Sequence, residues 1–178
     1  MRDGIGDMHV PGDIDEYDML VEQLNILQEN GKLLVNGTIN LSDLELTSLP
    51  ESFGNLQING DLVVANNLGS LPESFSNIQI NGSLYLSHNL LRSLPESFGN
   101  IQIKGDLGLQ GNQLASLPES FGNIQIGGSL YLFENKLTSL PESFGNLQIG
   151  GNLHLEGNNL PILPESFGNI QVGGNITN

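Results

Sequence analysis

Six glutamates recur along the chain at intervals of 22 or 23 residues, and each of them follows a proline. They are Glu51, Glu73, Glu96, Glu119, Glu142 and Glu165. A column of carboxylates could bind hard cations, because calcium takes carboxylate oxygens as ligands. A glutamate that follows proline can instead accept hydrogen bonds from the exposed N–H groups of a tight turn. We favour this second role, because the sequence has neither an EF-hand loop nor the GGxGxD pattern of calcium-binding β-rolls.

The other residues that could do chemistry do not form a constellation. His9, His88 and His154 are the only histidines, cysteine is absent, and no histidine has a partner at metal-ligand or triad spacing. We therefore predict no metal, no cofactor and no enzymatic activity. A row of glutamines is expected to hydrogen-bond along a stack, and a row of phenylalanines to form a packed spine. These rows are Gln57, Gln79, Gln102, Gln125, Gln148 and Gln171, and Phe53, Phe75, Phe98, Phe121, Phe144 and Phe167.

The fixed period predicts stacked coils, each of which buries its apolar face only against its neighbours. Within one coil, Leu107 and Leu109 alternate with polar or small residues, which predicts a short strand with one buried face. Asn112 ends that strand, where an amide can satisfy backbone groups of adjacent coils. Ile124 and Ile126 alternate around Gln125, which predicts a second short strand on the convex side.

The segments "LGLQGNQLASLP", "LYLSHNLLRSLP" and "LYLFENKLTSLP" resemble the leucine-rich repeat signature LxLxxNxLxxLP, and the resemblance covers roughly residues 32–178. It implies a leucine-rich repeat solenoid with short parallel β-strands on the concave face and extended or short-strand segments on the convex face. The first signature position departs from the family pattern, with Asn59, Asn81, Lys104, Gly127 and Gly150 where leucine is usual. The repeated "LPESFGN" segment is also similar to repeats of marseillevirus-type giant viruses.

The two ends of the repeat array differ. Residues 1–31 precede it, and apolar residues at helical spacing predict an amphipathic helix over about 14–29 that caps the first coil. Residues 32–178 are expected to form about six coils and a partial seventh. That last coil offers a short polar edge strand through which two copies could form a homodimer. The edge consists of Asn175, Ile176, Thr177 and Asn178.

Charge and composition exclude some classes of binding partner. The net charge is −15 with only five lysines and arginines, so we expect no nucleic acid and no anionic membrane as partner. No segment has the apolar length of a membrane span or of a signal peptide. With cysteine also absent, we expect a protein that is not secreted and that is cytoplasmic, in a host cell or virion if it is viral.

Two outward positions of the concave strand vary from coil to coil, and the shared core does not dictate them. The first position holds Asn40, Val63, Tyr85, Gly108, Tyr131 and His154 in successive coils. The second holds Ser42, Ala65, Ser87, Gln110, Phe133 and Glu156, and His88 and Glu134 follow it in two coils. Gly108 is expected to leave a shallow notch between two tyrosines.

Aromatic anchors with a polar rim are typical of protein interfaces. We therefore predict a protein-interaction scaffold that binds a partner protein through this concave face, with a basic surface favoured on the partner. The predicted contact residues are Tyr85, His88, Gln110, Tyr131, Phe133, Glu134, His154 and Glu156. The alternative is a structural, self-assembling component, for example of a viral particle or its assembly site, without a dedicated ligand.

Overall fold

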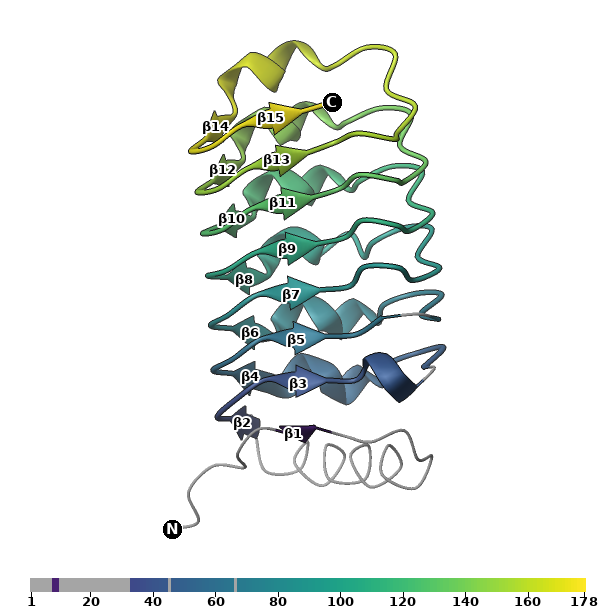
Figure 1. Cartoon of the computed structure of the whole chain (residues 1–178), viewed down its shortest axis with the longest axis vertical. Coiled ribbons are helices and arrows are strands. Elements are labelled where there is room, and N and C mark those ends of the chain that lie inside the picture. The colour runs from purple at the N-terminus through teal and green to yellow at the C-terminus, as the bar shows by residue number, and fades with distance from the viewer. Residues whose placement is uncertain (1–7, 10–32, 45, 66) are drawn as a thin grey trace.

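A computed structural model of the chain describes residues 8–9, 33–44, 46–65 and 67–178. Over these residues the chain winds as a solenoid of stacked coils (Figure 1). The leucine-rich repeat solenoid predicted from the sequence is confirmed. The predicted capping helix over about 14–29 lies outside the described residues.

One side of the stack is a parallel β-sheet of eight strands, which carries the outward positions predicted for the concave face (Figure 1). In spatial order the strands are β1 (Met8–His9), β3 (Ile39–Asn40), β5 (Leu62–Val63), β7 (Leu84–Tyr85), β9 (Leu107–Gly108), β11 (Leu130–Tyr131), β13 (Leu153–His154) and β15 (Ile176–Thr177). The register places equivalent repeat positions side by side, as with Leu107, Leu130 and Leu153. The strand at residues 8–9, which pairs with β3, was not predicted from the sequence.

A second parallel sheet of seven strands follows the predicted second row of short strands. Its strands are β2 (Leu33–Val35), β4 (Leu56–Ile58), β6 (Gln79–Ile80), β8 (Gln102–Ile103), β10 (Gln125–Ile126), β12 (Gln148–Ile149) and β14 (Gln171–Val172). In β4 to β12 the isoleucine is buried while the glutamine before it faces outward, because successive strand residues point to opposite faces. At Gly127 an added Cβ would lie 2.0 Å from the carbonyl oxygen of Lys104, so adjacent coils make a close contact at this corner.

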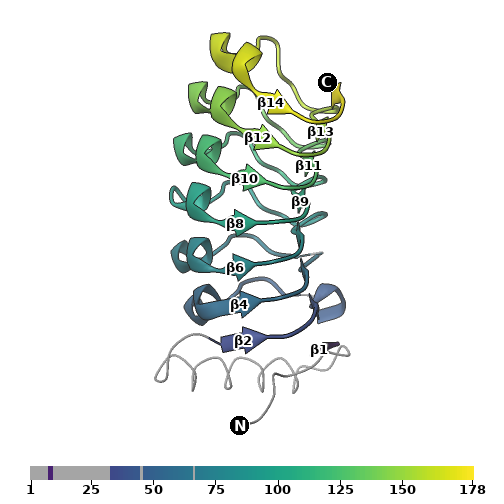
Figure 2. The ribbon, with the colours of Figure 1, turned by 90° about the vertical axis from the view of Figure 1, so that its left-hand side faces the viewer.

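The third side of each coil is a short 3-10 helix, opposite the eight-stranded sheet (Figure 2). These helices are η2 (Glu51–Asn55), η3 (Glu73–Asn77), η4 (Phe98–Asn100), η5 (Glu119–Asn123), η6 (Glu142–Asn146) and η7 (Glu165–Asn169). Pro118 shows how one begins: its ring fixes φ at −67°, its ψ of 154° is extended, and the helix starts at the next residue. The tight turn predicted after each proline is therefore a helical turn.

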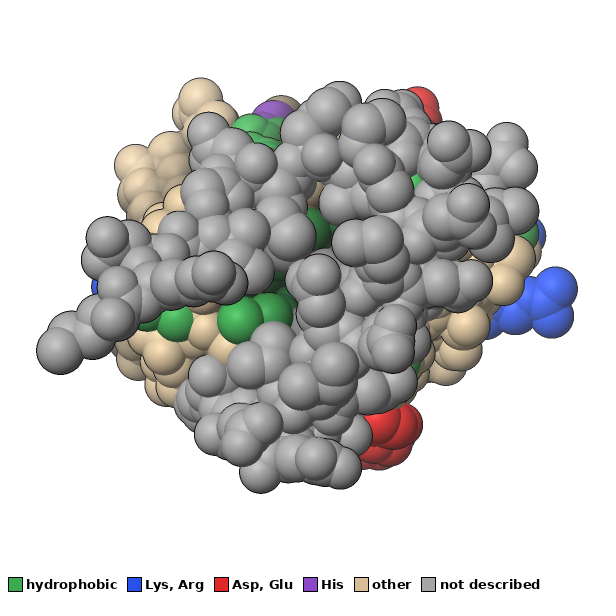
Figure 3. Space-filling model, turned by 90° about the horizontal axis from the view of Figure 1, so that it is seen from below, with side chains coloured by type: hydrophobic (Ala, Val, Ile, Leu, Met, Phe, Trp, Pro, Cys, Tyr) green, Lys and Arg blue, Asp and Glu red, His purple; other side chains and the backbone are tan. Residues whose placement is uncertain are grey.

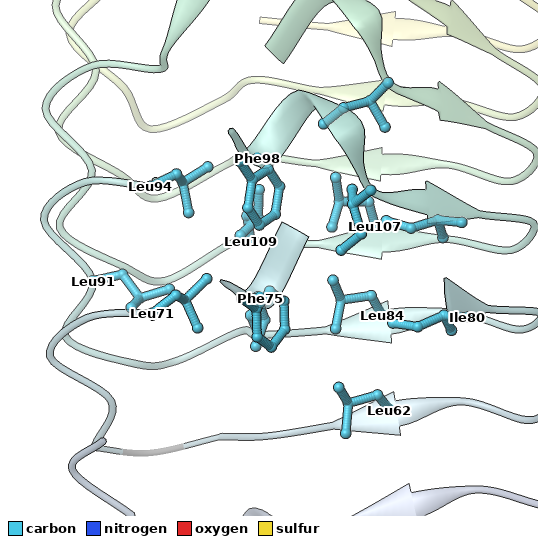
Figure 4. Packing of buried hydrophobic residues seen from close by; sticks show 14 of the residues in the cluster. Leu62, Leu71, Phe75, Ile80, Leu84, Leu91, Leu94, Phe98, Leu107 and Leu109 are labelled. Carbon is cyan, nitrogen blue, oxygen red and sulfur yellow. The ribbon is translucent and has the colours of Figure 1, made fainter. Parts of the chain in front are cut away.

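The core fills the space between the two sheets and the helical row. One phenylalanine from each helix lies inside, and the rings from Phe75 to Phe167 stack with centroids 6.1 to 6.5 Å apart. Leucines such as Leu84 and Leu107 meet these rings from the strand side (Figure 4). The predicted phenylalanine spine is thus confirmed as part of a continuous apolar interior.

Buried asparagines connect the central coils to the coils before them. Asn112 accepts a hydrogen bond from the Leu91 N–H at 3.1 Å. Its amide donates to the carbonyls of Leu86 at 2.8 Å and Leu109 at 3.0 Å. The first coil has Leu44 at this position, and there the chain forms a different short helix, η1 (Ser42–Leu44). The predicted role of asparagine at the end of the strand is therefore correct.

The last coil lacks a following coil among the described residues. Leu153 and Leu155 are fully buried, because the strand that contains Ile176 covers them, whereas Leu160 is only partly buried. Ile162, in the same repeat as Leu155, exposes 79% of its surface, and Ile176, in the last strand, exposes 44%. Seen from the opposite end, hydrophobic side chains of described residues are visible, and acidic side chains appear at two places on the rim (Figure 3).

Candidate functional site

The outward side of the eight-stranded sheet is called the sheet face. Its aromatic side chains lie close together near the C-terminal coils. Tyr131 and His154 come from the adjacent strands β11 and β13 and stack in parallel, with centroids 5.0 Å apart. Phe133 stands nearly perpendicular to both, at 6.4 Å from Tyr131 and 6.5 Å from His154. These three residues form the aromatic cluster. All three side chains are half-buried, so each retains a surface that a ligand could contact.

Polar side chains hold one edge of the aromatic cluster. Nδ1 of His154 lies 2.9 Å from Oγ1 of Thr177 and 3.4 Å from Oε1 of Glu156. A hydrogen bond from Thr177, a backbone hydrogen bond and the neighbouring His154 lower the pKa of Glu156 below its ordinary value. The Glu156 carboxylate is therefore charged near neutral pH and lies at the rim of the rings.

Tyr85 is separate from the aromatic cluster and belongs to a polar contact of its own. Its hydroxyl donates to Oδ2 of Asp106 at 3.2 Å. A hydrogen bond with Ser83 lowers the pKa of Tyr85, but burial and the negative charges of Asp106 and Asp61 outweigh it, so the pKa is raised. The phenol stays neutral well above physiological pH.

The notch expected at Gly108 is filled. Gly108 is buried, and an added Cβ would lie 2.9 Å from Cδ1 of Tyr85 and 3.1 Å from Oε1 of Gln110. The expectation of an open gap between Tyr85 and Tyr131 was therefore wrong, because the Tyr85 ring and the Gln110 side chain close over the glycine. Oε1 of Gln110 is itself buried and has no hydrogen-bond donor.

His88 and Glu134 occupy a turn position that favours glycine. Their φ angles are 55° and 54°, and the equivalent Gly111 and Gly157 have 67° and 69°. The left-handed region costs a residue with a Cβ more than it costs glycine, so both side chains are retained at an energetic cost. The Glu134 N–H donates to the carbonyl of Glu156 at 2.8 Å, which places the two predicted glutamates side by side.

The eight predicted contact residues thus divide into groups. Tyr131, Phe133, Glu134, His154 and Glu156 come together on strands β11 and β13 and the turns that follow them. Tyr85 and Gln110 meet over Gly108, one coil away, and His88 lies against Gly111. Five of the eight predicted contact residues therefore form one continuous group, and the other three lie apart from it.

Sequence reasoning missed a column of side-chain acceptors at the corner before each strand of the sheet face. Asp106 receives the N–H of Ser129 at 2.7 Å and also binds Tyr85, while Oγ of Ser129 receives the N–H of Asn152 at 2.9 Å. The signal was present, since each coil has a short polar residue immediately before its first core leucine or isoleucine. The acceptors are Thr38, Asp61, Ser83, Asp106, Ser129 and Asn152, and Asn175 holds the same position in the last coil.

The glutamate column lies on the helical side. Oε2 of Glu51 accepts from the N–H of Ser74 at 3.3 Å, and Oε2 of Glu142 accepts from the N–H of Ser166 at the same distance. These carboxylates therefore bond to the start of the helix in the next coil, in line with the turn-capping role favoured above. Within the described part of the chain, no group of three or more acidic or histidine side chains could hold a metal ion.

The glutamine row on the seven-stranded sheet does not form the expected hydrogen-bonded ladder. The ladder lies instead in the neighbouring column, where Asn81 donates to Asn59 and Asn59 donates to Asn36, each at 2.7 Å. Glycine replaces asparagine in that column from residue 127 onward. There an open groove of about 800 Å³ runs beside the exposed Gln125 and Gln148.

That groove does not coincide with the aromatic cluster. It is wide open, and its walls repeat the same uncharged residues in each coil apart from Lys104. A binding pocket is expected to bring together a few different polar groups, and the sheet face does so while the groove does not. We therefore take the sheet face as the candidate site.

The described residues include no helix long and apolar enough to cross a membrane. Residues 83–101 match the family model for the Leucine Rich Repeat. A comparison of the sequence with curated proteins gave no match.

Several solved structures share the fold. A chain of the Toll–Spatzle complex of Drosophila superposes with a TM-score of 0.55 and 26% identity. The alignment covers 74% of this chain and 18% of that one. YopM from Yersinia enterocolitica gives a TM-score of 0.49 and 26% identity over 94% of this chain and 40% of its own.

A leucine-rich repeat protein of Leptospira interrogans gives 0.33 and 21% identity, over 78% of this chain and 49% of its own. This chain therefore spans less than half the length of each of these three. The solenoid, together with the repeat at residues 83–101, supports a leucine-rich repeat protein.

Proposed function

We propose that this protein is an interaction scaffold, not an enzyme, and that it binds a partner protein through the sheet face around the aromatic cluster. The observation that carries the proposal is the gathering of Tyr131, Phe133 and His154 on one open surface. Aromatic residues are only 6% of the chain, and five of the seven phenylalanines are fully buried in the core. Half-buried rings with charged neighbours match the anchors and rim of protein interfaces.

The similarity to a chain of the Toll–Spatzle complex supports a binding role in general, since that structure is described as a complex and as a molecular hub. The sheet face also meets the geometric needs of such a role. Its rings sit on paired strands whose backbone hydrogen bonds fix them, for example from the Leu132 N–H to the His154 carbonyl at 2.8 Å. A rigid site loses little conformational entropy on binding.

The test is to capture partners from a cell lysate on the parent protein and then measure the affinity of the purified partner. The double variant Tyr131→Ala with Phe133→Ala should keep its fold, because neither side chain belongs to the buried core. We expect it to bind about 30-fold more weakly, from a loss of roughly 1 kcal/mol or more per anchor. Unchanged affinity in a variant with unchanged circular dichroism would overturn the proposal.

A second candidate, self-assembly through the C-terminal edge, is favoured by the last coil. Strands β14 and β15 each pair with one neighbour only, and Ile162 and Ile176 are exposed beside them. Two such edges could meet about a twofold axis, with Asn175, Thr177 and Asn178 at the seam.

Sedimentation of the parent chain and of Ile176→Lys separates the two candidates. Self-assembly predicts a dimer that the lysine abolishes, since its charge would be desolvated at the seam. A parent that stays monomeric at high concentration ends this second candidate.

We include the setting in the proposal: action inside a cell, with no nucleic acid or membrane as ligand. The likeness of the repeats to those of marseillevirus-type giant viruses makes an infected host cell the setting to test first.

A further inference from the structure

We propose that the aromatic cluster receives the side chain of an arginine or lysine from the partner, held between the ring of Phe133 and the carboxylates of Glu134 and Glu156. This inference rests on the proposed function and deepens it, since it gives the chemistry of the group that the partner must present. The occupant is a basic protein segment.

The three rings do not form a flat apolar layer: the plane of Phe133 stands nearly perpendicular to the other two, and the angle between them is called the corner. Tyr131 and His154 stack on one another with an interplanar angle of 4°, whereas the plane of Phe133 is turned by 82° and 78° from them. The face of an aromatic ring carries negative electrostatic potential and attracts a cation. The planar guanidinium of arginine is especially suited, because it stacks on ring faces while its N–H groups bond to carboxylates.

Two glutamates neighbour the corner. Glu156 neighbours Phe133 in the next coil, and 46% of its side chain remains exposed. Glu134 follows Phe133 directly, and the contact of its N–H with the Glu156 carbonyl holds the two residues together. Among the described residues no lysine or arginine forms an ion pair with either carboxylate, and the one contact of this kind joins Glu156 to the ring of His154.

The position of Glu134 adds to the argument. The repeat places glycine there in two other coils, at Gly111 and Gly157, and glycine suits the left-handed φ of 54° that Glu134 adopts. The Glu134 side chain leans over Gly157, with Cγ 3.4 Å from where a Cβ would be. A charged residue kept in a conformation that favours glycine, next to rings and a second carboxylate, fits a role in binding.

Charge complementarity selects the occupant. The whole chain carries a net charge of −15, so an acidic or phosphorylated segment would be repelled from this face. An apolar side chain would desolvate the two carboxylates without giving either of them a cation, which is costly. An arginine or lysine satisfies both the rings and the carboxylates.

The experiment titrates the full chain with a capped arginine tetrapeptide and, separately, with the citrulline tetrapeptide of the same length and no charge. Ring signals of Tyr131 and Phe133 are followed by NMR at moderate salt, which screens the attraction of the net charge. We expect the arginine peptide to shift these signals and to bind about tenfold more tightly than the citrulline peptide. Equal effects of the two peptides would overturn the inference.

Variants locate the binding. Phe133→Leu keeps an apolar side chain without a π face and should weaken arginine binding, as should Glu134→Gln with Glu156→Gln. Glu119→Gln with Glu142→Gln removes the same charge from the helical side and serves as the matched control. Equal weakening by this control pair would show attraction by net charge alone and contradict a site at the aromatic cluster.

The outcome also separates this inference from the proposed function. If Glu134→Gln with Glu156→Gln leaves the captured partner bound while Tyr131→Ala with Phe133→Ala releases it, the cation inference is wrong and the scaffold proposal stands. If both double variants keep the partner at full affinity, the scaffold proposal fails. Circular dichroism confirms that each variant is folded.

Discussion

The interior of the solenoid and its sheet face are built from the same coils, yet they differ in how much they vary. Inside, Phe98, Phe121 and Phe144 repeat without change and lie fully buried in one stack. On the sheet face, the equivalent residues of three adjacent strands are Gly108, Tyr131 and His154. A stacked fold requires the same interior in each coil, whereas it leaves the outward strand positions free. The comparison therefore assigns stability to the repeated residues and supports the proposal that the varied ones bind a partner.

The largest expected effect concerns a repeated interior residue. Asn112→Ala should lower the free energy of unfolding by about 2 kcal/mol or more. The buried Leu91 N–H loses its acceptor at about 1–3 kcal/mol, and the carbonyls of Leu86 and Leu109 each lose one bond but keep a second asparagine donor, Asn89 or Asn135. Urea unfolding measures the change. Asn158→Ala is the control, since Asn158 makes equivalent bonds but is only half-buried, where water can replace the amide. Equal losses in both variants would contradict a role that depends on burial.

Two equivalent glycines test whether close contact between adjacent coils is what excludes a larger side chain at this position. A Cβ on Gly122 would lie 2.0 Å from the carbonyl oxygen of Ser143 in the next coil, whereas a Cβ on the equivalent Gly168 meets nothing within 4 Å. Gly122→Ala should cost about 1–3 kcal/mol, the typical range for overpacking. Gly168→Ala should be neutral or slightly stabilising. A melting temperature that falls equally in both variants would show that the penalty arises within one coil.

On the sheet face we expect a single substitution to raise stability and to weaken binding. Glu134→Gly should raise the free energy of unfolding by about 0.5–1 kcal/mol, because glycine adopts the left-handed φ at lower cost. The same variant should bind the arginine tetrapeptide more weakly than the parent. Chemical denaturation and the NMR titration test the two halves of this prediction, and a variant that loses stability would contradict it.

The smallest effect is a titration. Asp106→Asn should lower the pKa of Tyr85 toward its ordinary value near 10, since it removes a negative charge that opposes formation of tyrosinate. Because the folded-state pKa of Tyr85 is raised, its contribution to stability is present below about pH 10 and is lost as the pH rises through the folded-state pKa. Tyrosinate absorbance measures the shift, and Tyr85→Phe identifies the signal. An unchanged titration in Asp106→Asn would mean that burial and Asp61, and not Asp106, raise the pKa.

The fold could be predicted from the sequence because its period is regular. Leu107 with Leu109, and Ile124 with Ile126, have the alternation of short strands, and Asn112 stands where buried backbone groups need an amide. The pairing of residues 8–9 with β3 has no such signal, because two residues are too few to show a pattern. The amide ladder was assigned to the glutamines and is formed by Asn36, Asn59 and Asn81. Sequence alone does not reveal which of two adjacent columns lies at bonding distance.

The sequence was enough to predict which strand positions form the candidate site, but not how their side chains contact one another. The strand alternation placed Tyr131 and His154 outward on neighbouring strands, where the structure stacks them. The closure of Tyr85 over Gly108 depends on a rotamer and on the hydrogen bond to Asp106, and neither follows from the spacing of residues. Side-chain direction beyond Cβ is set by such local contacts.

The most direct test of the central claim compares the two sheets in one binding experiment. The affinity of a captured partner is measured by titration calorimetry for the parent, for Tyr131→Ala with Phe133→Ala, and for Gln125→Ala with Gln148→Ala on the seven-stranded sheet. The account predicts a loss of about 30-fold or more in the first pair and less than about twofold in the second. A partner that loses affinity only with the glutamine pair would contradict the assignment of binding to the varied face.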